Sequence, residues 1–392
     1  MSRKSVKKVT LQLLSILALC IPCALPAHAN LIINATFDSN ITNDPSAASI
    51  EGAINTAIQE FENLYSNPIT VSIYFQEGGD LGTSNTLIYN VPYESADGIS
   101  GVYNQLVATD ANPAAIAALN ASGGDPYTNG GVNPVGGIND IEIKSANLRA
   151  LGYTVAPSCV VTPQSSGDLP NECAVPCTPS TEPCTANSQL PHVDGIVSLQ
   201  TSITDPPNTP QADYFDLVAT AEHEIDEILG LGSALENCDP SDTTGVTAAC
   251  KSGGNLDAAN DTPNGVGTLQ DLFRWNAPTG GTRTLSTNCS SPTSAYFAYG
   301  PDTGEIAQLN NACNDGDFGD WQSSPLPNGV NPQVQDAFSS AGQTPAYGQS
   351  EIDAMTAIGY TLASPEPGTL VLFGVGLAML GAFRRRLGAG KY

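Results

Sequence analysis

The segment AEHEIDEILGLGS, Ala221 to Ser233, carries the strongest indication of both fold and chemistry in the chain. His223 and Glu227 stand four residues apart, so on a helix they project from one face and can reach a single ion. Glu224 lies roughly 100° further round such a helix, where it reaches a water molecule beside the ion. Gly230 then allows the sharp turn that ends the helix. The alternative interpretation is an acidic, solvated helix face that carries one histidine.

The residue patterns on either side of this segment predict an α+β fold. Apolar residues recur on one stripe over residues 49–65, which is typical of an amphipathic helix, and alternate with polar residues over 69–75, which is typical of a strand. Strands are expected at residues 31–37, 69–75 and 195–200, and helices at 49–65, 113–119, 141–151, 214–229 and 350–359. We therefore expect a twisted mixed sheet with an active-site helix, followed by a loop-rich C-terminal subdomain.

Both ends of the chain are typical of an exported protein. Basic residues and the apolar run Leu11–Leu25 precede an Ala-His-Ala sequence, which predicts a secretory signal peptide over residues 1–29. At the other end, Pro365-Glu366-Pro367 precedes an apolar stretch and three arginines. This order resembles the PEP-CTERM sorting signal, which implies recognition by an exosortase-type enzyme. We expect residues 364–392 to contain a transmembrane helix that anchors the protein transiently in the inner membrane before export to the surface; a plain C-terminal anchor is the alternative.

The charge of the chain excludes a nucleic-acid partner. It has 13 Lys and Arg residues against 39 Asp and Glu residues, for a formal net charge of −26. Most of the basic residues lie in the two terminal segments, and the exported part retains Lys144, Arg149, Lys251, Arg274 and Arg283. Such a surface repels nucleic acid and anionic lipid, and it suits a protein that binds divalent cations.

The cysteines predict disulfides in an oxidising compartment. Ten cysteines occur, and eight remain once the signal peptide is removed, an even number that is typical of exported proteins. We expect the pairs Cys238–Cys250 and Cys289–Cys313, because each closes a local loop. The other four lie in or beside a Cys/Pro-rich insertion, residues 157–191, and are expected to pair among themselves. A zinc cluster there is the alternative, and the irregular spacing disfavours it.

The central segment also resembles a known family. HEIDEILGLGS is similar to the HExxHxxGxG(S/T) stretch of metzincin peptidases, especially leishmanolysin-like bacterial proteins. In that resemblance Glu227 stands at the second ligand position, and Ser233 stands where many metzincins have a third histidine. The third ligand then lies downstream, at Asp320 in GDFGDW, with Asp315 and Asp317 as competing candidates. The sequences LQDLFRWNAP (269–278) and SEIDAMTAIGY (350–360) resemble the same exported metalloprotease group.

The resemblance implies a zincin-like, metal-dependent peptidase in residues 30–363. His223, Glu227 and Asp320 would hold zinc, with Mn or Ca as alternatives for an oxygen-rich site, and Glu224 would act as general base towards a peptide or protein substrate. The strand at residues 195–200 is expected to be the sheet edge that pairs with the substrate. His192 is expected in a loop or at a strand edge, with a role as a metal ligand as the less favoured alternative. Met355 is expected in the core, and Asp271 is expected to pair with Arg274 or to cap a turn.

Two other classes of function stay open at this point. One is a non-catalytic surface or extracellular-matrix protein that retains the zincin fold and a structural metal. The other is a calcium-dependent adhesion module that acts through its acidic surface.

Overall fold

The computed structural model describes residues 30–86, 88–93, 101–109, 111–121, 140–156, 159–160, 192–205, 212–233, 267–284, 294–300, 303–311 and 316–363. Residues Asn30–Leu362 form one compact unit. The predicted signal peptide, the C-terminal apolar helix and the cysteine side chains lie outside the described residues. Within the described part, no helix combines the length and the apolar character needed to cross a membrane.

The main sheet has four strands in the order β1-β2-β8-β3. These strands are β1 (Ile32–Phe37), β2 (Thr70–Glu77), β8 (Gly195–Leu199) and β3 (Gly82–Thr86). The first three run parallel, with Ile33 opposite Val71 and Phe75 opposite Val197. β3 pairs antiparallel with β8. The sheet is thus mixed, and the expected α+β class is confirmed at this level.

The expectation that residues 195–200 form the sheet edge is wrong. β8 lies between β2 and β3, and all five of its residues are buried. Its sequence, GIVSL, lacks the polar alternation of a half-exposed strand, which is typical of a strand covered on both faces. The two edges are β1 and β3, and the sequence of β3, GTSNT, is polar and small.

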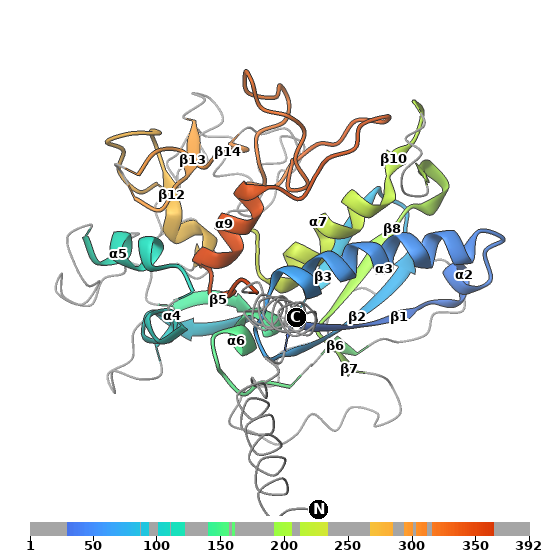
Figure 1. Cartoon of the computed structure of the whole chain (residues 1–392), viewed down its shortest axis with the longest axis horizontal. Coiled ribbons are helices and arrows are strands. Elements are labelled where there is room, and N and C mark those ends of the chain that lie inside the picture. Colours follow the sequence, from blue (N-terminus) through green and yellow to red (C-terminus); the bar gives the residue numbers. More distant parts are fainter. Residues whose placement is uncertain are drawn as a thin grey trace, which may run out of the picture. The chain divides into compact units, whose positions relative to one another are not determined.

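Two helices lie side by side over one face of this sheet (Figure 1). They are α3 (Ala47–Leu64), which buries its predicted apolar stripe, and α7 (Leu217–Leu229), which carries the central segment. α7 begins at Asp216, whose side chain accepts hydrogen bonds from the backbone N–H groups of Val218 and Ala219. It ends at Gly230, whose φ of +142° favours glycine. Both predicted helices are confirmed.

The prediction of a helix over residues 141–151 is wrong for its first half. It begins as β5 (Asp140–Lys144) and continues as α6 (Ser145–Ala150). Ile141 and Ile143 are buried while Glu142 and Lys144 alternate with them, which is a strand pattern of period two. β5 is the middle strand of the second sheet, between β11 (Gly267–Thr268) and β4 (Ile88–Pro92).

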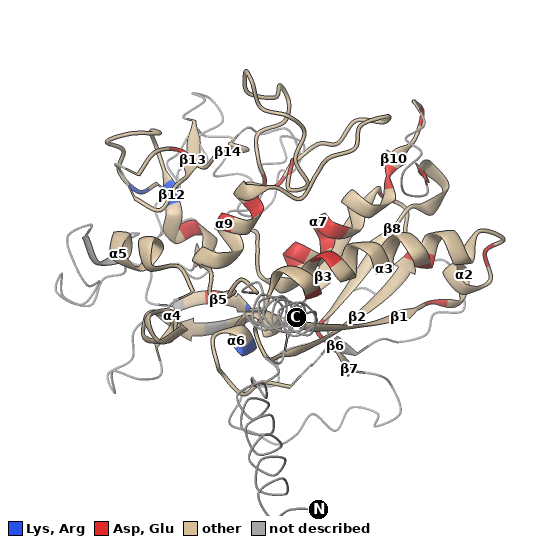
Figure 2. Cartoon of the chain, in the orientation of Figure 1, with Lys and Arg blue, Asp and Glu red and all other residues tan. Residues whose placement is uncertain are grey.

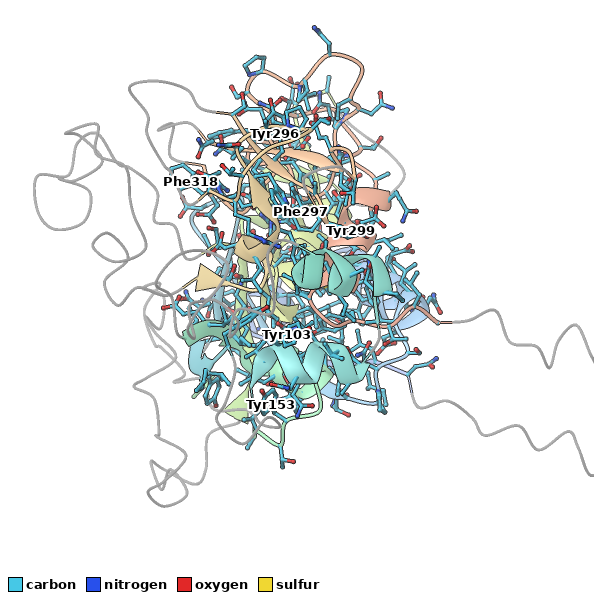
Figure 3. All side chains as sticks on the ribbon, turned by 90° about the vertical axis from the view of Figure 1, so that its left-hand side faces the viewer. Tyr103, Tyr153, Tyr296, Phe297, Tyr299 and Phe318 are labelled. Carbon is cyan, nitrogen blue, oxygen red and sulfur yellow. The ribbon has the colours of Figure 1, made fainter. Side chains whose placement is uncertain are left out.

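The C-terminal part is mostly irregular and is held by an aromatic cluster. Figure 3 shows Phe297 and Tyr299 lying close together, and the Phe297 ring also lies 5.8 Å from Trp321. The Tyr299 hydroxyl reaches the backbone of α9 (Gln349–Ala357), the helix predicted near the end of the core. Met355 is fully buried, as expected. The segment that carries Asp320 is therefore fixed by packing although it has little regular structure.

The remaining elements are short. They are α2 (Ser39–Thr42), α4 (Val102–Thr109), α5 (Pro113–Ala121), β6 (Cys159–Val160), β7 (His192–Val193), η2 (Thr201–Ile203), β9 (Thr204–Asp205), β10 (Phe215–Asp216), η3 (Gln270–Phe273), β12 (Arg274–Trp275), β13 (Ala295–Phe297) and β14 (Ala307–Leu309). Asp271, in η3, accepts hydrogen bonds from Thr268 N and Oγ1, so its side chain caps this turn.

Candidate metal centre

The structure brings the three predicted ligands together. His223 and Glu227 project from one face of α7, and Asp320 approaches from the irregular segment before Trp321. One donor atom from each residue lies within 4.8 Å of the other two. His223 Nε2 is 3.8 Å from Glu227 Oε1 and 3.9 Å from Asp320 Oδ2. No competing group of this kind occurs in the described part of the chain.

The second polar atom of each ligand is held by a neighbouring segment. The three contacts are His223 Nδ1 with the Val334 carbonyl at 2.9 Å, Ser84 Oγ with Glu227 Oε2 at 2.6 Å, and Gln335 Nε2 with Asp320 Oδ1 at 2.9 Å. An imidazole that donates from Nδ1 to a carbonyl has Nε2 free as a lone-pair donor. The atoms left over, Nε2, Oε1 and Oδ2, are the ones that converge.

The geometry of these atoms fits a small divalent ion. Separations of 3.8 and 3.9 Å are too long for hydrogen bonds, so the three side chains do not satisfy one another. Ligand bonds of about 2.1 Å accommodate donor atoms up to about 4.2 Å apart, and both separations from His223 Nε2 lie within this limit. The side chains of His223 and Glu227 are 18% and 12% exposed, so each is partly accessible to solvent. The residues therefore fit a metal with nitrogen and oxygen ligands.

Glu224 lies beside the three donors, and its carboxyl group contacts that of Glu227. It is 5% exposed, and its Oε2 atom has no hydrogen-bond partner among the described residues. A side chain at Gly82, on the edge strand β3, would collide with Glu224 Oε1. The edge strand thus has a glycine at the point where the carboxylate needs room, and Glu224 keeps an unpaired oxygen next to the ligands.

The site is strongly acidic, and this changes how its groups bind protons. Figure 2 shows acidic residues gathered along α7 and at the start of α9. Burial disfavours protonation of His223, but the carboxylates of Asp320, Glu224 and Glu227 outweigh it and raise its pKa to about 10. Burial raises the pKa of Asp320 to about 8, and burial together with Glu227 raises the pKa of Glu224. A metal ion that binds here must therefore displace protons.

Lys144 is a functional candidate that the sequence analysis missed. Its Nζ atom donates a 2.7 Å hydrogen bond to the Leu231 carbonyl, just after α7. Burial lowers its pKa, and the carboxylates of Glu227, Asp317 and Glu224 oppose this effect. Among the described residues it is the only lysine. Recognising the period-two pattern of residues 140–144 would have placed it at the end of a strand.

Buried polar side chains fix the segment that carries Asp320. Arg274 Nη1 donates to the Phe318 carbonyl at 2.6 Å, and Gln270 Nε2 donates to the Gly319 carbonyl at 2.5 Å. Trp321 Nε1 donates to Glu351 Oε1 at 3.1 Å, which ties the segment to α9. The two motifs that resembled the metalloprotease group, LQDLFRWNAP and SEIDAMTAIGY, thus supply anchors for the segment of the predicted third ligand.

The other candidates are placed differently. Asp317 is exposed and is absent from the three-residue group, and Asp315 lies outside the described residues. The backbone of His192 lies in β7, and its side chain lies outside the described part. Asp320 is 3% exposed and is the carboxylate of this segment that reaches the site.

Comparison with known proteins finds one family model that matches a short C-terminal segment of the chain. The PEP-CTERM protein-sorting motif matches residues 365–386. The match indicates an exported, cell-surface protein that an exosortase-type sorting enzyme recognises. No curated protein and no solved structure matches the chain.

Proposed function

We propose that the described domain is an exported, zincin-like peptidase in which His223, Glu227 and Asp320 hold a divalent ion, preferentially zinc. The observation that carries the proposal is the convergence of Nε2, Oε1 and Oδ2 while the second polar atom of each ligand is hydrogen-bonded elsewhere. Hydrogen bonds of this kind orient the three remaining donor atoms towards a common point, as partners of metal-ligating side chains do. One histidine with two carboxylates is a donor set that zinc accepts, with Mn or Ca as competitors.

The chain supplies a base beside this group. A divalent ion held there would polarise a peptide carbonyl and lower the pKa of a water molecule. Glu224 accepts the proton of the attacking water through its unpaired Oε2 and then passes it to the leaving amine. Burial and the neighbouring Glu227 carboxylate raise the pKa of Glu224 in the metal-free protein.

The edge strand β3 supports a role in binding the substrate. Among the described strands it is one of the two outer strands of the main sheet, and it lies against α7. An extended peptide would pair with the free backbone groups of β3 and pass over the ligands on α7. This assignment replaces the strand at residues 195–200, which is internal.

The terminal segments support the same cellular setting. We propose that the apolar residues after Pro367 anchor the protein transiently in the inner membrane until the sorting enzyme acts. In the exported state the cysteines would be oxidised to disulfides, including Cys238–Cys250 and Cys289–Cys313.

Metal analysis and proteolysis of the purified protein test the proposal. We expect bound zinc in the wild type, cleavage of casein, and loss of cleavage with retained metal in Glu224→Gln. His223→Ala should lose the ion. Metal without cleavage would favour the non-catalytic surface protein. Calcium that is unaffected by His223→Ala would favour the adhesion module, and absence of any metal would refute the site.

A further inference from the structure

Both carboxylate ligands of the candidate centre have one oxygen already engaged. Glu227 Oε2 accepts from Ser84 Oγ at 2.6 Å, and Asp320 Oδ1 accepts from Gln335 Nε2 at 2.9 Å. The opposite oxygens, Oε1 and Oδ2, are the ones that lie 3.8 and 3.9 Å from His223 Nε2. Each carboxylate therefore presents a single oxygen to the site.

The contact to Glu227 is set by the edge strand. Side chains alternate along a strand, so Gly82 and Ser84 of β3 lie on one side of it. This is the side that meets α7, because Gly82 abuts Glu224 and Ser84 donates to Glu227. β3 is itself held to β8 by antiparallel pairing, with Ser84 opposite Val197. Ser84 thus fixes the carboxylate from a rigid element.

The contact to Asp320 is set by a fully buried amide. Gln335 is 0% exposed, its backbone N–H donates to Glu351 Oε1 at 3.2 Å, and its carbonyl accepts from Trp321 N at 2.7 Å. The side-chain NH₂ group of Gln335 donates to Asp320 Oδ1. An ionised carboxylate can only accept hydrogen bonds, so it suits this donor. The preceding residue, Val334, accepts the hydrogen bond from His223, so one turn orients two of the ligands.

We infer that Ser84 and Gln335 determine the metal specificity of the site by holding Glu227 and Asp320 monodentate. The inference rests on the proposed function, and it adds the reason why zinc is preferred over calcium or manganese. Three protein donor atoms leave one open position around a four-coordinate zinc ion, as a catalytic zinc site has. Calcium takes about 6–8 oxygen ligands and uses bidentate carboxylates, which the two hydrogen bonds prevent.

Removing the two donors from the full-length protein tests this inference. Ser84→Ala and Gln335→Met leave the ligands and the side-chain volumes nearly unchanged but free the second carboxylate oxygens. We expect zinc affinity to fall by about 10- to 100-fold in the double variant, while Mn²⁺ affinity falls less, so the ratio of the two affinities decreases. With Co²⁺ as a probe, the intense visible absorption of a four-coordinate ion should weaken as the coordination number rises.

Two variants serve as matched controls outside the site. Ser145→Ala removes a serine hydroxyl that donates to the Asp194 carboxylate at 2.7 Å, and Gln76→Met removes a buried amide that donates to Ser198 Oγ at 2.9 Å. Both should keep the Zn²⁺/Mn²⁺ affinity ratio and the Co²⁺ spectrum of the wild type, even if they lower stability.

The outcomes separate this inference from the proposed function. A wild type that binds no ion overturns both. A wild type that binds zinc, together with a double variant whose affinity ratio and Co²⁺ spectrum are unchanged, overturns the role of Ser84 and Gln335 alone. A changed ratio that also appears in the controls overturns it as well, because general loosening of the fold would then explain the effect.

Discussion

At the scale of single residues, the site is defined by excess negative charge around one histidine and one lysine. His223 faces Asp320, Glu224 and Glu227, while Lys144 lies nearby with its Nζ atom bonded to the Leu231 carbonyl. Like charges confined in this way repel one another unless a cation or protons neutralise them. In the metal-free protein the lysine and bound protons have this role.

Lys144→Met should destabilise the metal-free protein. The change removes a partly buried positive charge from the carboxylate cluster and leaves the Leu231 carbonyl without its donor. An unsatisfied buried carbonyl costs about 1–3 kcal/mol, so we expect a loss of that order in urea unfolding with a chelator present. Saturating metal should narrow the difference, because the ion supplies positive charge. Equal stability of variant and wild type without metal would contradict this role.

Glu222 predicts a pH dependence of stability. It lies on α7, and burial followed by the charges of Glu60 and Asp216 raises its pKa to about 8. A folded-state pKa above the unfolded value of 4.5 means that the folded protein binds the proton more tightly. The associated stability is complete below pH 4.5 and is lost as pH rises through about 8.

Glu222→Gln removes the titrating carboxyl group, and with it this pH dependence of the free energy of unfolding. Relative to the variant, the wild type should lose up to about 1.4 kcal/mol of stability for each pH unit within that window. Chemical unfolding of both proteins at several pH values measures the difference. A constant difference between pH 5 and pH 9 would show that Glu222 does not titrate in this range.

At the scale of elements, the packing of β3 against α7 positions two of the acidic side chains of the site. The strand leaves space for Glu224 at Gly82 and holds Glu227 through Ser84. The proposed base Glu224 and the proposed ligand Glu227 lie about one helical turn apart, and each contacts a different residue of the same strand. If β3 pairs with the substrate, the substrate backbone is placed in register with both side chains.

Gly82→Ala tests the role of Glu224 independently of the three proposed metal ligands. The new methyl group would displace the Glu224 carboxylate, whereas His223, Glu227 and Asp320 keep their positions. We expect kcat to fall by about 100-fold or more, the typical contribution of a general base, with metal content unchanged. Gly79→Ala is the matched control, because a side chain there meets nothing within 4 Å. Unchanged kcat in Gly82→Ala would argue against Glu224 as the base.

At the scale of the whole molecule, the three candidate ligands and their partners join parts of the chain that are far apart in the sequence. The contacts Ser84–Glu227 and His223–Val334 span 143 and 111 residues. An ion bound at the junction would therefore tie the main sheet, α7 and the C-terminal part to one another, and it would stabilise all of them.

Metal binding should be linked to both protons and stability. Because His223 and Asp320 have pKa values of about 10 and about 8 in the metal-free protein, up to two protons leave when the ion binds near neutral pH. Zinc affinity should therefore strengthen from about pH 6 to about pH 9. Free zinc at about 100 times its Kd should add about 2.7 kcal/mol of stability. Calorimetry in buffers of different ionisation enthalpy measures the protons, and an affinity independent of pH would contradict this linkage.

The sequence by itself determined the local features. It identified α7, the spacing of His223 and Glu227 on one face, the position of Glu224 and the glycine that ends the helix, because these depend on contacts within a few residues. The PEP-CTERM motif at residues 365–386 was equally evident, since it is read along the chain. Asp320 was selected among three neighbouring aspartates only through a resemblance.

The tertiary structure decided the rest. Whether β8 or β3 is the sheet edge depends on which strands pair, and residues Ser84, Gln335 and Val334 acquire roles only because long-range packing places them against the ligands. Lys144 is a candidate because it lies at the end of β5, where its Nζ atom bonds to the Leu231 carbonyl just after α7. Single polar residues of this kind have no periodic pattern around them, and their partners lie up to 143 residues away, so no local rule could have assigned them.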